Sequence, residues 1–356
     1  MFLNHLWYYP STGNLNYLFN LGFFITVFMT IQIVSGLILT LAYLDHYNGF
    51  YSVLTILHDV HFGFMFRYIH QNNTSLVMIL VFSHMFRQIA YTVYHNQYVY
   101  NSGLLIVYVL MAELFLGYLL VWGQISFWGA TVITQLLGYI PDFLDWISGD
   151  FAISLKTLKR LFIFHFLIGL FVFVLMYVHF FYLHEVGNNG TYLFLTNNKT
   201  IIFIYLVKDF LGLMLIYTFA TSQYFFHWFR FAHSDNIIEA NPKKTPPHII
   251  PEWYFLPEYY ILKAIPSKLG GLLVMIGFVI MWIQFDNKSS QSYQMTPVKT
   301  LRPWNVILLS VVIMLGILGA QLPMTWQVET GRPLIVLIFV LCNSVHRIEL
   351  NMYSRR

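Results

Sequence analysis

Apolar residues occur in long runs that are separated by shorter polar stretches. An α-helix of about 20 residues crosses the hydrocarbon core of a bilayer, and the apolar runs are close to that length. A chain in a membrane must also satisfy its backbone hydrogen bonds internally, which favours helices over open strands. We therefore expect an all-α polytopic membrane protein with eight transmembrane helices. The predicted spans are residues 18–44, 67–94, 102–122, 159–184, 200–226, 269–285, 304–322 and 333–346.

Three longer polar stretches do not fit a span. Residues 45–66 carry aspartates and histidines and predict a loop or a surface helix. Residues 123–158 contain glycines, a proline and aspartates, which favour short amphipathic helices lying along the membrane surface. Residues 227–268 form a polar, proline-rich connection. We accordingly divide the chain into residues 1–200, with the first four spans, and residues 201–356, with the rest.

Two pairs of histidines lie inside predicted spans at the same spacing. His70 and His84 are fourteen residues apart, and so are His165 and His179. Fourteen residues of α-helix rise ~21 Å and complete almost four turns, so each pair lies on one face of its helix. Two such helices facing each other present one histidine each at two levels. A flat macrocycle whose metal takes two axial nitrogens fits each level, which predicts two haems with bis-histidine ligation, an arrangement suited to electron transfer.

Glycines repeat the same interval on the two other helices of this group. Gly22 and Gly36 lie in the first span, and Gly103 and Gly117 in the third. A glycine lets the backbone approach a bulky planar ligand where a Cβ would collide. Glycines in membrane helices usually serve helix packing, and a single buried histidine is often a satisfied polar group. The equal spacing of both pairs on four consecutive spans favours a four-helix bundle that holds two haems.

Composition narrows the class of protein. The chain has 356 residues, of which 58% are hydrophobic and only 10% charged, too apolar for an ordinary soluble protein. The net charge of +4 is spread over the loops, so there is no footprint of nucleic-acid binding. The one cysteine, Cys342, excludes an intrachain disulfide, a cysteine-ligated cluster and covalent haem attachment. No lysine or arginine precedes Arg67, so we expect no cleavable targeting segment.

Two carboxylates stand out as candidates for chemistry. Glu252 follows a series of prolines that stiffen its loop and hold it beside Tyr254. A carboxylate among aromatic rings at the rim of an apolar cavity could take a proton from a phenolic substrate, although a solvated loop glutamate is the simpler interpretation. Glu113 lies near the middle of the third span, where charge is costly. It predicts either a functional group or a protonated, hydrogen-bonded carboxyl of the bundle.

Several motifs together resemble one family. Residues 251–254 read Pro-Glu-Trp-Tyr, and residues 123–134 read Gly-Gln-Ile-Ser-Phe-Trp-Gly-Ala-Thr-Val-Ile-Thr. Both segments, with the two histidine pairs and the four glycines, are similar to the cytochrome b family of the mitochondrial cytochrome bc1 complex. The resemblance covers nearly the whole chain. Plant-type cytochrome b6 is split in two and has one more residue between its second histidine pair, so this chain resembles the respiratory type.

The resemblance implies roles for the residues around the haems. His70 and His165 would ligate the low-potential haem near the outer face, and His84 and His179 the high-potential haem near the inner face. Guanidinium groups pair well with carboxylates, and three arginines match positions near haem propionates. These are Arg67, Arg87 and Arg160.

The resemblance also implies two quinone sites. An outer quinol-oxidation pocket would have three catalytic residues, Glu252, Tyr254 and Tyr259, and two further substrate-binding residues, Gly129 and Ile133. An inner quinone-reduction site would bind quinone and deliver protons through His184, Lys208 and Asp209. For the inner residues, a charge cluster at the membrane surface is the simpler interpretation.

The function implied by the resemblance is that of the core redox subunit of a ubiquinol–cytochrome c oxidoreductase, complex III. Quinol would be oxidised at the outer site, and electrons would pass through two b-type haems to quinone at the inner site, coupled to proton translocation. The implied partners are a Rieske iron–sulfur protein, cytochrome c1, other subunits of the complex and a second copy of the complex, within a lipid bilayer. The implied location is the mitochondrial inner membrane, with a respiratory bacterial membrane as the alternative.

Some positions depart from the family pattern. Val121 and Gly169 each stand where proline is usual, and Glu113 stands where a small or hydroxyl residue is usual. Pro257-Glu258 replaces a usual apolar pair, and Asn188 a usual serine. These departures bear on the shape of the pockets. Two other classes stay open on the residues alone: a different dihaem membrane cytochrome, and a cofactor-free transporter whose histidines form a proton relay.

Overall fold

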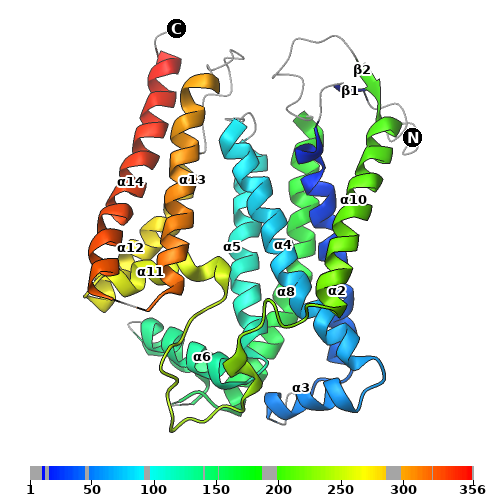
Figure 1. Cartoon of the computed structure of the whole chain (residues 1–356), viewed down its shortest axis with the longest axis vertical. Coiled ribbons are helices and arrows are strands. Elements are labelled where there is room, and N and C mark those ends of the chain that lie inside the picture. Colours follow the sequence, from blue (N-terminus) through cyan, green and yellow to red (C-terminus); the bar gives the residue numbers. More distant parts are fainter. Residues whose placement is uncertain are drawn as a thin grey trace.

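The long helices of the protein run side by side in two groups (Figure 1). The computed structural model describes residues 10–12, 16–44, 48–91, 97–138, 141–150, 152–186, 199–285, 298–322 and 324–354. The larger group contains η1 (Tyr17–Asn20), α2 (Leu21–Thr40), α4 (Gly63–Tyr91), α5 (Gln97–Leu119), α8 (Leu155–Val186) and α10 (Ile202–Phe225). The smaller group contains α11 (Leu256–Ala264), α12 (Lys268–Met281), η4 (Trp282–Phe285), α13 (Val298–Ala320) and α14 (Thr325–Ser354).

Every predicted span coincides with one of these helices. Among the described residues, five helices are long and apolar enough to cross a membrane: Tyr17–Thr40, Gln97–Leu119, Leu155–His184, Pro303–Ala320 and Thr325–Ser344. The other three predicted spans fall on α4, on α10 and on the short α12. The N-terminal end of α2 and the C-terminal end of α14 lie at the same end of the molecule in Figure 1.

The helix ends lie up to eight residues from the predicted bounds of the spans. The eighth span was predicted from residue 333, yet α14 begins at Thr325 and contains Pro333. The extra turns are held by packing against α11: the Tyr260 hydroxyl donates to the Gln327 carbonyl (2.7 Å), and Arg332 Nε donates to the Ala264 carbonyl (2.9 Å). These contacts offset the one backbone hydrogen bond that proline removes. At the fifth span, residues 199–201 form β2 (Lys199–Ile201), which pairs antiparallel with β1 (Pro10–Thr12).

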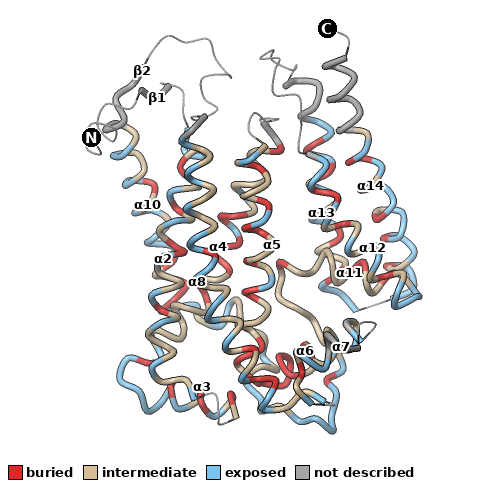
Figure 2. The backbone as a smooth tube through the Cα atoms, turned by 180° about the vertical axis from the view of Figure 1, so that it is seen from behind, coloured by how far each residue is buried: buried red, intermediate tan, exposed pale blue. Residues whose placement is uncertain are grey.

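Short helices close the lower end of the molecule in Figure 1. They are α3 (Gly49–His58), α6 (Gln124–Leu137) and, labelled in Figure 2, α7 (Pro141–Ser148), which agrees with the short helices predicted at residues 123–158. The connection after α10, which contains η2 (Ser234–Ile237), packs on α6. The backbone N–H of Gln124 donates to the Ile238 carbonyl (2.9 Å). A Cβ at Gly123 would come within 2.4 Å of the Asn236 carbonyl oxygen, so this contact needs glycine.

A buried polar network explains why α4 carries so many polar residues. Asn73 Nδ2 donates to the Phe28 carbonyl and to Gln32 Oε1, both at 2.8 Å, and Tyr224 donates its hydroxyl to Asn73 Oδ1 at 2.8 Å. Gln32 Nε2 donates in turn to Thr74 Oγ1 (3.1 Å). Because the side chains of Asn73, Gln32 and Tyr224 are paired with one another, they tie α2, α4 and α10 together instead of destabilising the bundle. Figure 2 shows the buried positions on the inward sides of these helices.

Candidate functional site

The four predicted haem ligands form two facing pairs. The ring centroids of His70 on α4 and His165 on α8 are 6.3 Å apart, and those of His84 and His179 are 6.5 Å apart. Two imidazoles that bind one metal from opposite sides, each with a metal–nitrogen bond of about 2 Å, place their ring centres about 6 Å apart. Both separations therefore fit bis-histidine ligation of one iron at each level.

Each predicted glycine lies against one of these rings. A Cβ at Gly36 would come within 2.9 Å of His70 Cε1, and at Gly117 within 2.6 Å of His165 Cε1. At Gly103 the distance to His179 Cε1 would be 3.0 Å. At Gly22 it would be 3.7 Å to His84 Cε1, which is ordinary contact. At three of the four glycines, a Cβ would therefore collide with the histidine ring. The sequence had suggested that the macrocycle would be the group in contact.

Hydrogen bonds at Nδ1 fix the orientation of three rings. His70 Nδ1 donates to the Gln32 carbonyl (3.0 Å), with Ser35 Oγ 3.1 Å away. His165 Nδ1 lies 3.1 Å from the Glu113 carbonyl, and His179 Nδ1 lies 3.0 Å from Ser102 Oγ. A histidine that donates through Nδ1 leaves Nε2 unprotonated and free to bind a metal.

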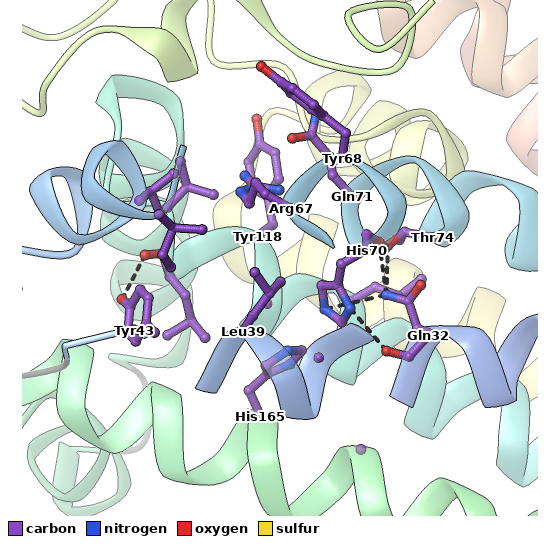
Figure 3. A pocket seen from close by; sticks show the side chains of 18 of the residues that line it. Gln32, Leu39, Tyr43, Arg67, Tyr68, His70, Gln71, Thr74, Tyr118 and His165 are labelled. Carbon is purple, nitrogen blue, oxygen red and sulfur yellow. Dashed lines mark hydrogen bonds between the residues drawn. The ribbon is translucent and has the colours of Figure 1, made fainter. Parts of the chain in front are cut away.

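A cavity of about 610 Å³ lies at the His70–His165 level (Figure 3). It is bordered by Gly36 on α2, by Arg67 on α4 and by Gly117 on α5. Its size lies within the range of cofactor-binding cavities, and its walls are mostly apolar with a few polar groups. The paired unprotonated nitrogens, the glycines and the neighbouring guanidinium of Arg67 together fit a haem with its propionates at this level.

The other two predicted arginines lie elsewhere. Arg87, one turn from His84 on α4, places its guanidinium 4.8 Å from the centre of the Phe19 ring. Arg160 Nη1 donates to the carbonyls of Asp145 (3.2 Å) and Trp146, and therefore fastens the end of α7 to α8. Of the three arginines, Arg67 is the one that lines the cavity.

The proline-rich loop brings Glu252 to the same cavity. Trp253 Nε1 donates to Ser75 Oγ on α4 (3.2 Å), and the Trp253 ring meets the Phe82 ring at 78° with centroids 6.0 Å apart. Tyr254 is buried with 4% of its surface exposed, and it lines the cavity together with Glu252. Burial raises the pKa of the Glu252 carboxyl to about 7, and it raises the pKa of Tyr254. Glu252 is therefore poised to accept a proton near neutral pH.

Glu252 also borders a second cavity of about 360 Å³. This cavity is lined by Arg230, His233 and Pro251 among others, from the connection after α10 and from the loop itself. A carboxyl that borders two cavities can exchange a proton with groups in either of them.

Three predicted outer-site residues line neither cavity. Gly129 on α6 faces open space, since a Cβ there would meet no atom within 4 Å, and Ile133 lies one turn further on. Tyr259 lies on α11 under Lys263, whose Nζ is 5.3 Å from the ring centre. The structure therefore brings together Glu252 and Tyr254 but not the whole predicted pocket.

The predicted inner-site residues lie on α8 and α10, near the ends that are remote from α6. The His184 ring packs against Phe180 at an interplanar angle of 45°, with ring centroids 3.9 Å apart, close to the end of α8. Lys208 and Asp209 lie in the first half of α10, and Lys208 Nζ is 4.7 Å from the centre of the Tyr17 ring. Both elements reach the upper end of the bundle in Figure 1, opposite the Glu252 loop. Asn188 lies outside the described residues.

Known proteins share both the sequence pattern and the fold. The family model described as cytochrome b/b6/petB matches residues 6–187, and the one described as cytochrome b(C-terminal)/b6/petD matches residues 239–339. The chain belongs to the cytochrome b family. Membership of this family implies that the chain binds b-type haem.

The relatives span eukaryotes and bacteria. Cytochrome b of Phytophthora megasperma is 39% identical over 328 residues, covering 89% of this chain and 85% of the relative. Cytochrome b of Rickettsia prowazekii is 38% identical, covering 90% of this chain and 83% of the relative. A solved structure described as a hyperthermophilic respiratory Complex III contains a chain with a TM-score of 0.92 at 27% identity, over 99% of this chain and 96% of that chain. The cytochrome b fold is thus retained across wide sequence divergence.

Several residues that shape the haem level were missed from the sequence. Gln32, Ser35 and Ser102 supply partners around the histidines, and Ser75 anchors the Glu252 loop. Ser35 and Ser102 each directly precede a predicted glycine, so the repeated Ser-Gly pair was a usable signal. Ser75 carried no such signal, because its partner Trp253 is far away in the sequence.

Proposed function

We propose that this cytochrome b-family chain is the core redox subunit of a ubiquinol–cytochrome c oxidoreductase, complex III. Quinol would be oxidised at the outer site beside Glu252, and quinone would be reduced at the inner site on α8 and α10. The observation that carries the proposal is the pair of facing histidine levels, with ring centroids 6.3 Å and 6.5 Å apart on the same two helices. The family membership and the fold of the related Complex III chain support it.

Two b-type haems, when bound, would carry single electrons between the two quinone sites. His70 and His165 would hold one iron, and His84 and His179 the other. Fourteen residues of helix separate the two levels by ~21 Å, which is most of the ~30 Å apolar thickness of a bilayer. We therefore assign the four helices α2, α4, α5 and α8 to a haem-binding unit, residues 1–200, and the rest to residues 201–356. We also propose that α4, α10 and α12 cross the membrane, which makes eight spans.

Proton transfer falls to the side chains at the two ends. Glu252 would accept a proton from quinol, with Tyr254 and Tyr259 completing the pocket and with Gly129 and Ile133 contacting substrate. At the opposite end, His184, Lys208 and Asp209 would bind quinone and deliver protons to it. Release at one face and uptake at the other constitute the proton translocation of the cycle.

The partners and location follow from the resemblance. Electrons that leave the outer site one at a time require an acceptor at that surface, and the family pattern implies a Rieske iron–sulfur protein followed by cytochrome c1. We propose a dimeric complex in the mitochondrial inner membrane. A respiratory bacterial membrane is the alternative, given relatives such as that of Rickettsia prowazekii.

A reduced-minus-oxidised absorption spectrum of the purified protein tests the proposal. We expect a Soret band and two b-type components in a redox titration. His179→Ala should remove one component and leave the other, whereas His61→Asn, at an exposed position between α3 and α4, should retain both. A transporter would show no Soret band, and two intact components in the His179 variant would refute the ligand assignment.

A further inference from the structure

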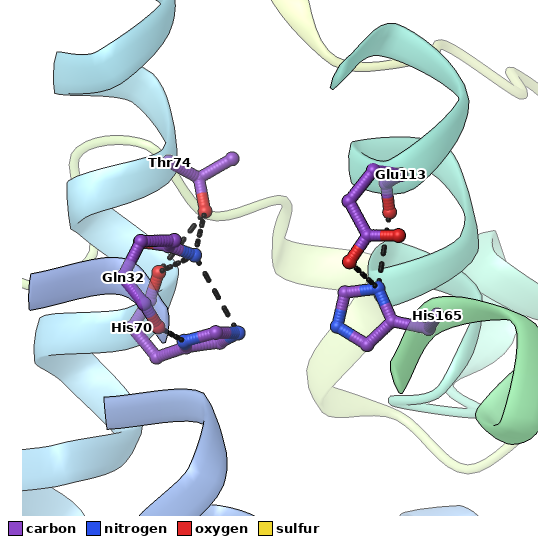
Figure 4. A network of polar contacts seen from close by, with 5 residues as sticks. All are labelled: Gln32, His70, Thr74, Glu113 and His165. Carbon is purple, nitrogen blue, oxygen red and sulfur yellow. Dashed lines mark hydrogen bonds and ion pairs between the residues drawn. The ribbon is translucent and has the colours of Figure 1, made fainter. Parts of the chain in front are cut away.

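One of the four histidines has a carboxylate as its partner. Glu113 Oε1 on α5 lies 2.7 Å from His165 Nδ1, and the backbone carbonyl of the same residue lies 3.1 Å from that nitrogen (Figure 4). The Nδ1–H therefore points at two oxygens of a single residue, one of which belongs to an acidic group. Carboxylates behind a metal-bound histidine raise the basicity of the ligand.

The facing histidine has the same backbone contact but no charge. Its Nδ1 donates to the carbonyl of Gln32, which lies four residues before Gly36, just as Glu113 lies four residues before Gly117. The Gln32 side-chain amide donates to the His70 carbonyl (3.0 Å) and to Thr74 Oγ1 (3.1 Å), and its nitrogen lies 3.5 Å from His70 Nε2, as Figure 4 shows. The two helices thus present equivalent positions to the two rings, and only one of them carries an acid.

The carboxylate is buried and held in place. Only 8% of Glu113 is exposed, and its Oε2 has no hydrogen-bond partner among the described residues. Space for Oε1 exists because residue 169 is glycine: a Cβ there would come within 2.8 Å of that oxygen. A buried acidic group is costly unless it is paired, and His165 is the partner that the geometry supplies.

We propose that Glu113 is a positioning residue that tunes the haem level at His70 and His165. By accepting the Nδ1–H of His165, the carboxylate orients the ring and makes Nε2 a stronger electron donor, which favours the oxidised iron and lowers the reduction potential of that haem. The inference rests on the proposed haem ligation and is independent of the quinone chemistry. The other level has a serine hydroxyl at His179 and is not affected.

The first test is Glu113→Gln, which keeps the size of the side chain and removes its charge. In a spectroelectrochemical titration of the purified complex, we expect both haems to be bound. The ratio of reduced to oxidised form of one haem, at a fixed applied potential, should rise about tenfold, which corresponds to a midpoint shift of about 59 mV for one electron. The second haem should keep its midpoint. An unchanged midpoint with both haems present would overturn the proposal.

A second variant moves the carboxylate without removing it. In Gly169→Ala the added methyl displaces Oε1 from His165, so the same haem should shift in the same direction. This variant decides the matter if Glu113→Gln fails to assemble, and an unchanged midpoint in it would overturn the proposal. If Glu113→Gln does assemble, adding Gly169→Ala to it should cause no further shift. Ser102→Ala is the matched control, because it changes only the partner of His179 and should shift only the other haem. If the unmodified protein binds no haem, the proposed function itself is refuted. That result is distinct from an unchanged midpoint in the variants.

Discussion

The sharpest prediction concerns Glu252 and the pH dependence of quinol oxidation. Burial raises the pKa of this carboxyl to about 7, and the side chain borders the cavity at the His70–His165 level. A general base acts in its ionised form. With a pKa of about 7, roughly one tenth of the carboxyl is ionised at pH 6 and roughly nine tenths at pH 8. The rate of quinol oxidation should therefore rise roughly ninefold between these pH values.

Glu252→Gln removes the base and keeps the shape of the loop. We expect quinol oxidation to slow by ~10–100-fold at pH 8, the lower part of the range for a positioned base, because water can substitute in part. The loss should be smaller at pH 6, where the parental carboxyl is mostly protonated. Both haems should remain bound, since no histidine is touched.

The assay is pre-steady-state reduction of the haems by quinol, with the inner site blocked by an inhibitor. Glu258→Gln is the matched control, because burial also raises the pKa of Glu258 to about 7, yet this side chain borders neither of the two cavities. It should keep the parental rate and the parental rise with pH. If the Glu252 variant behaves like the parent and the Glu258 variant loses the rise, the assignment of the base to Glu252 is wrong.

Two further variants probe the packing of the site. Gly117→Ala puts a methyl within 2.6 Å of His165 Cε1, so the haem content measured by pyridine haemochrome assay should fall towards one per chain. Gly22→Ala, whose methyl would lie 3.7 Å from His84 Cε1, should retain two haems, and equal haem content in both variants would mean that these glycines serve ordinary helix packing. Trp253→Phe keeps an aromatic ring but loses the hydrogen bond to Ser75, so the KM for quinol should rise about 2–10-fold in steady-state kinetics, with both midpoint potentials unchanged. An unaltered KM would mean that this hydrogen bond does not hold the loop.

The helices were predictable because their cause is local. Runs of apolar residues of membrane-crossing length, and the glycines and aspartates of residues 123–158, are visible without any long-range contact. The eighth span was drawn too short for the opposite reason. Its first turns are held by Tyr260 and Arg332, and no local pattern reveals a contact between α11 and α14.

In the candidate site, too, features with a local cause were predictable and features that depend on long-range contacts were not. The fourteen-residue spacing placed four histidines in two facing pairs, because helical periodicity converts sequence distance into space. It could not show that the glycines differ, since Gly22 leaves room that Gly117 does not. It could not place Gly129 or Tyr259 relative to Glu252, because loops of different elements meet there. The assignment of Gly129 and Tyr259 to the outer pocket rested on resemblance, which suggests roles for these residues but does not predict which residues they contact.

Two residues that the resemblance marks as departures from the family pattern share one space in the structure. By that resemblance, a small or hydroxyl residue is expected at Glu113 and proline at Gly169. Neither residue alone indicates a functional change. In the structure, the carboxylate occupies space that any Cβ at residue 169 would obstruct, and it points at a predicted haem ligand one turn away from that glycine on α8. An acid buried beside His165 without Gly169 would be displaced, and a glycine without the acid would leave a gap. We therefore expect the effects of substitutions at Glu113 and Gly169 to be coupled. The quantity to measure in such variants is the reduction potential of the haem at His165.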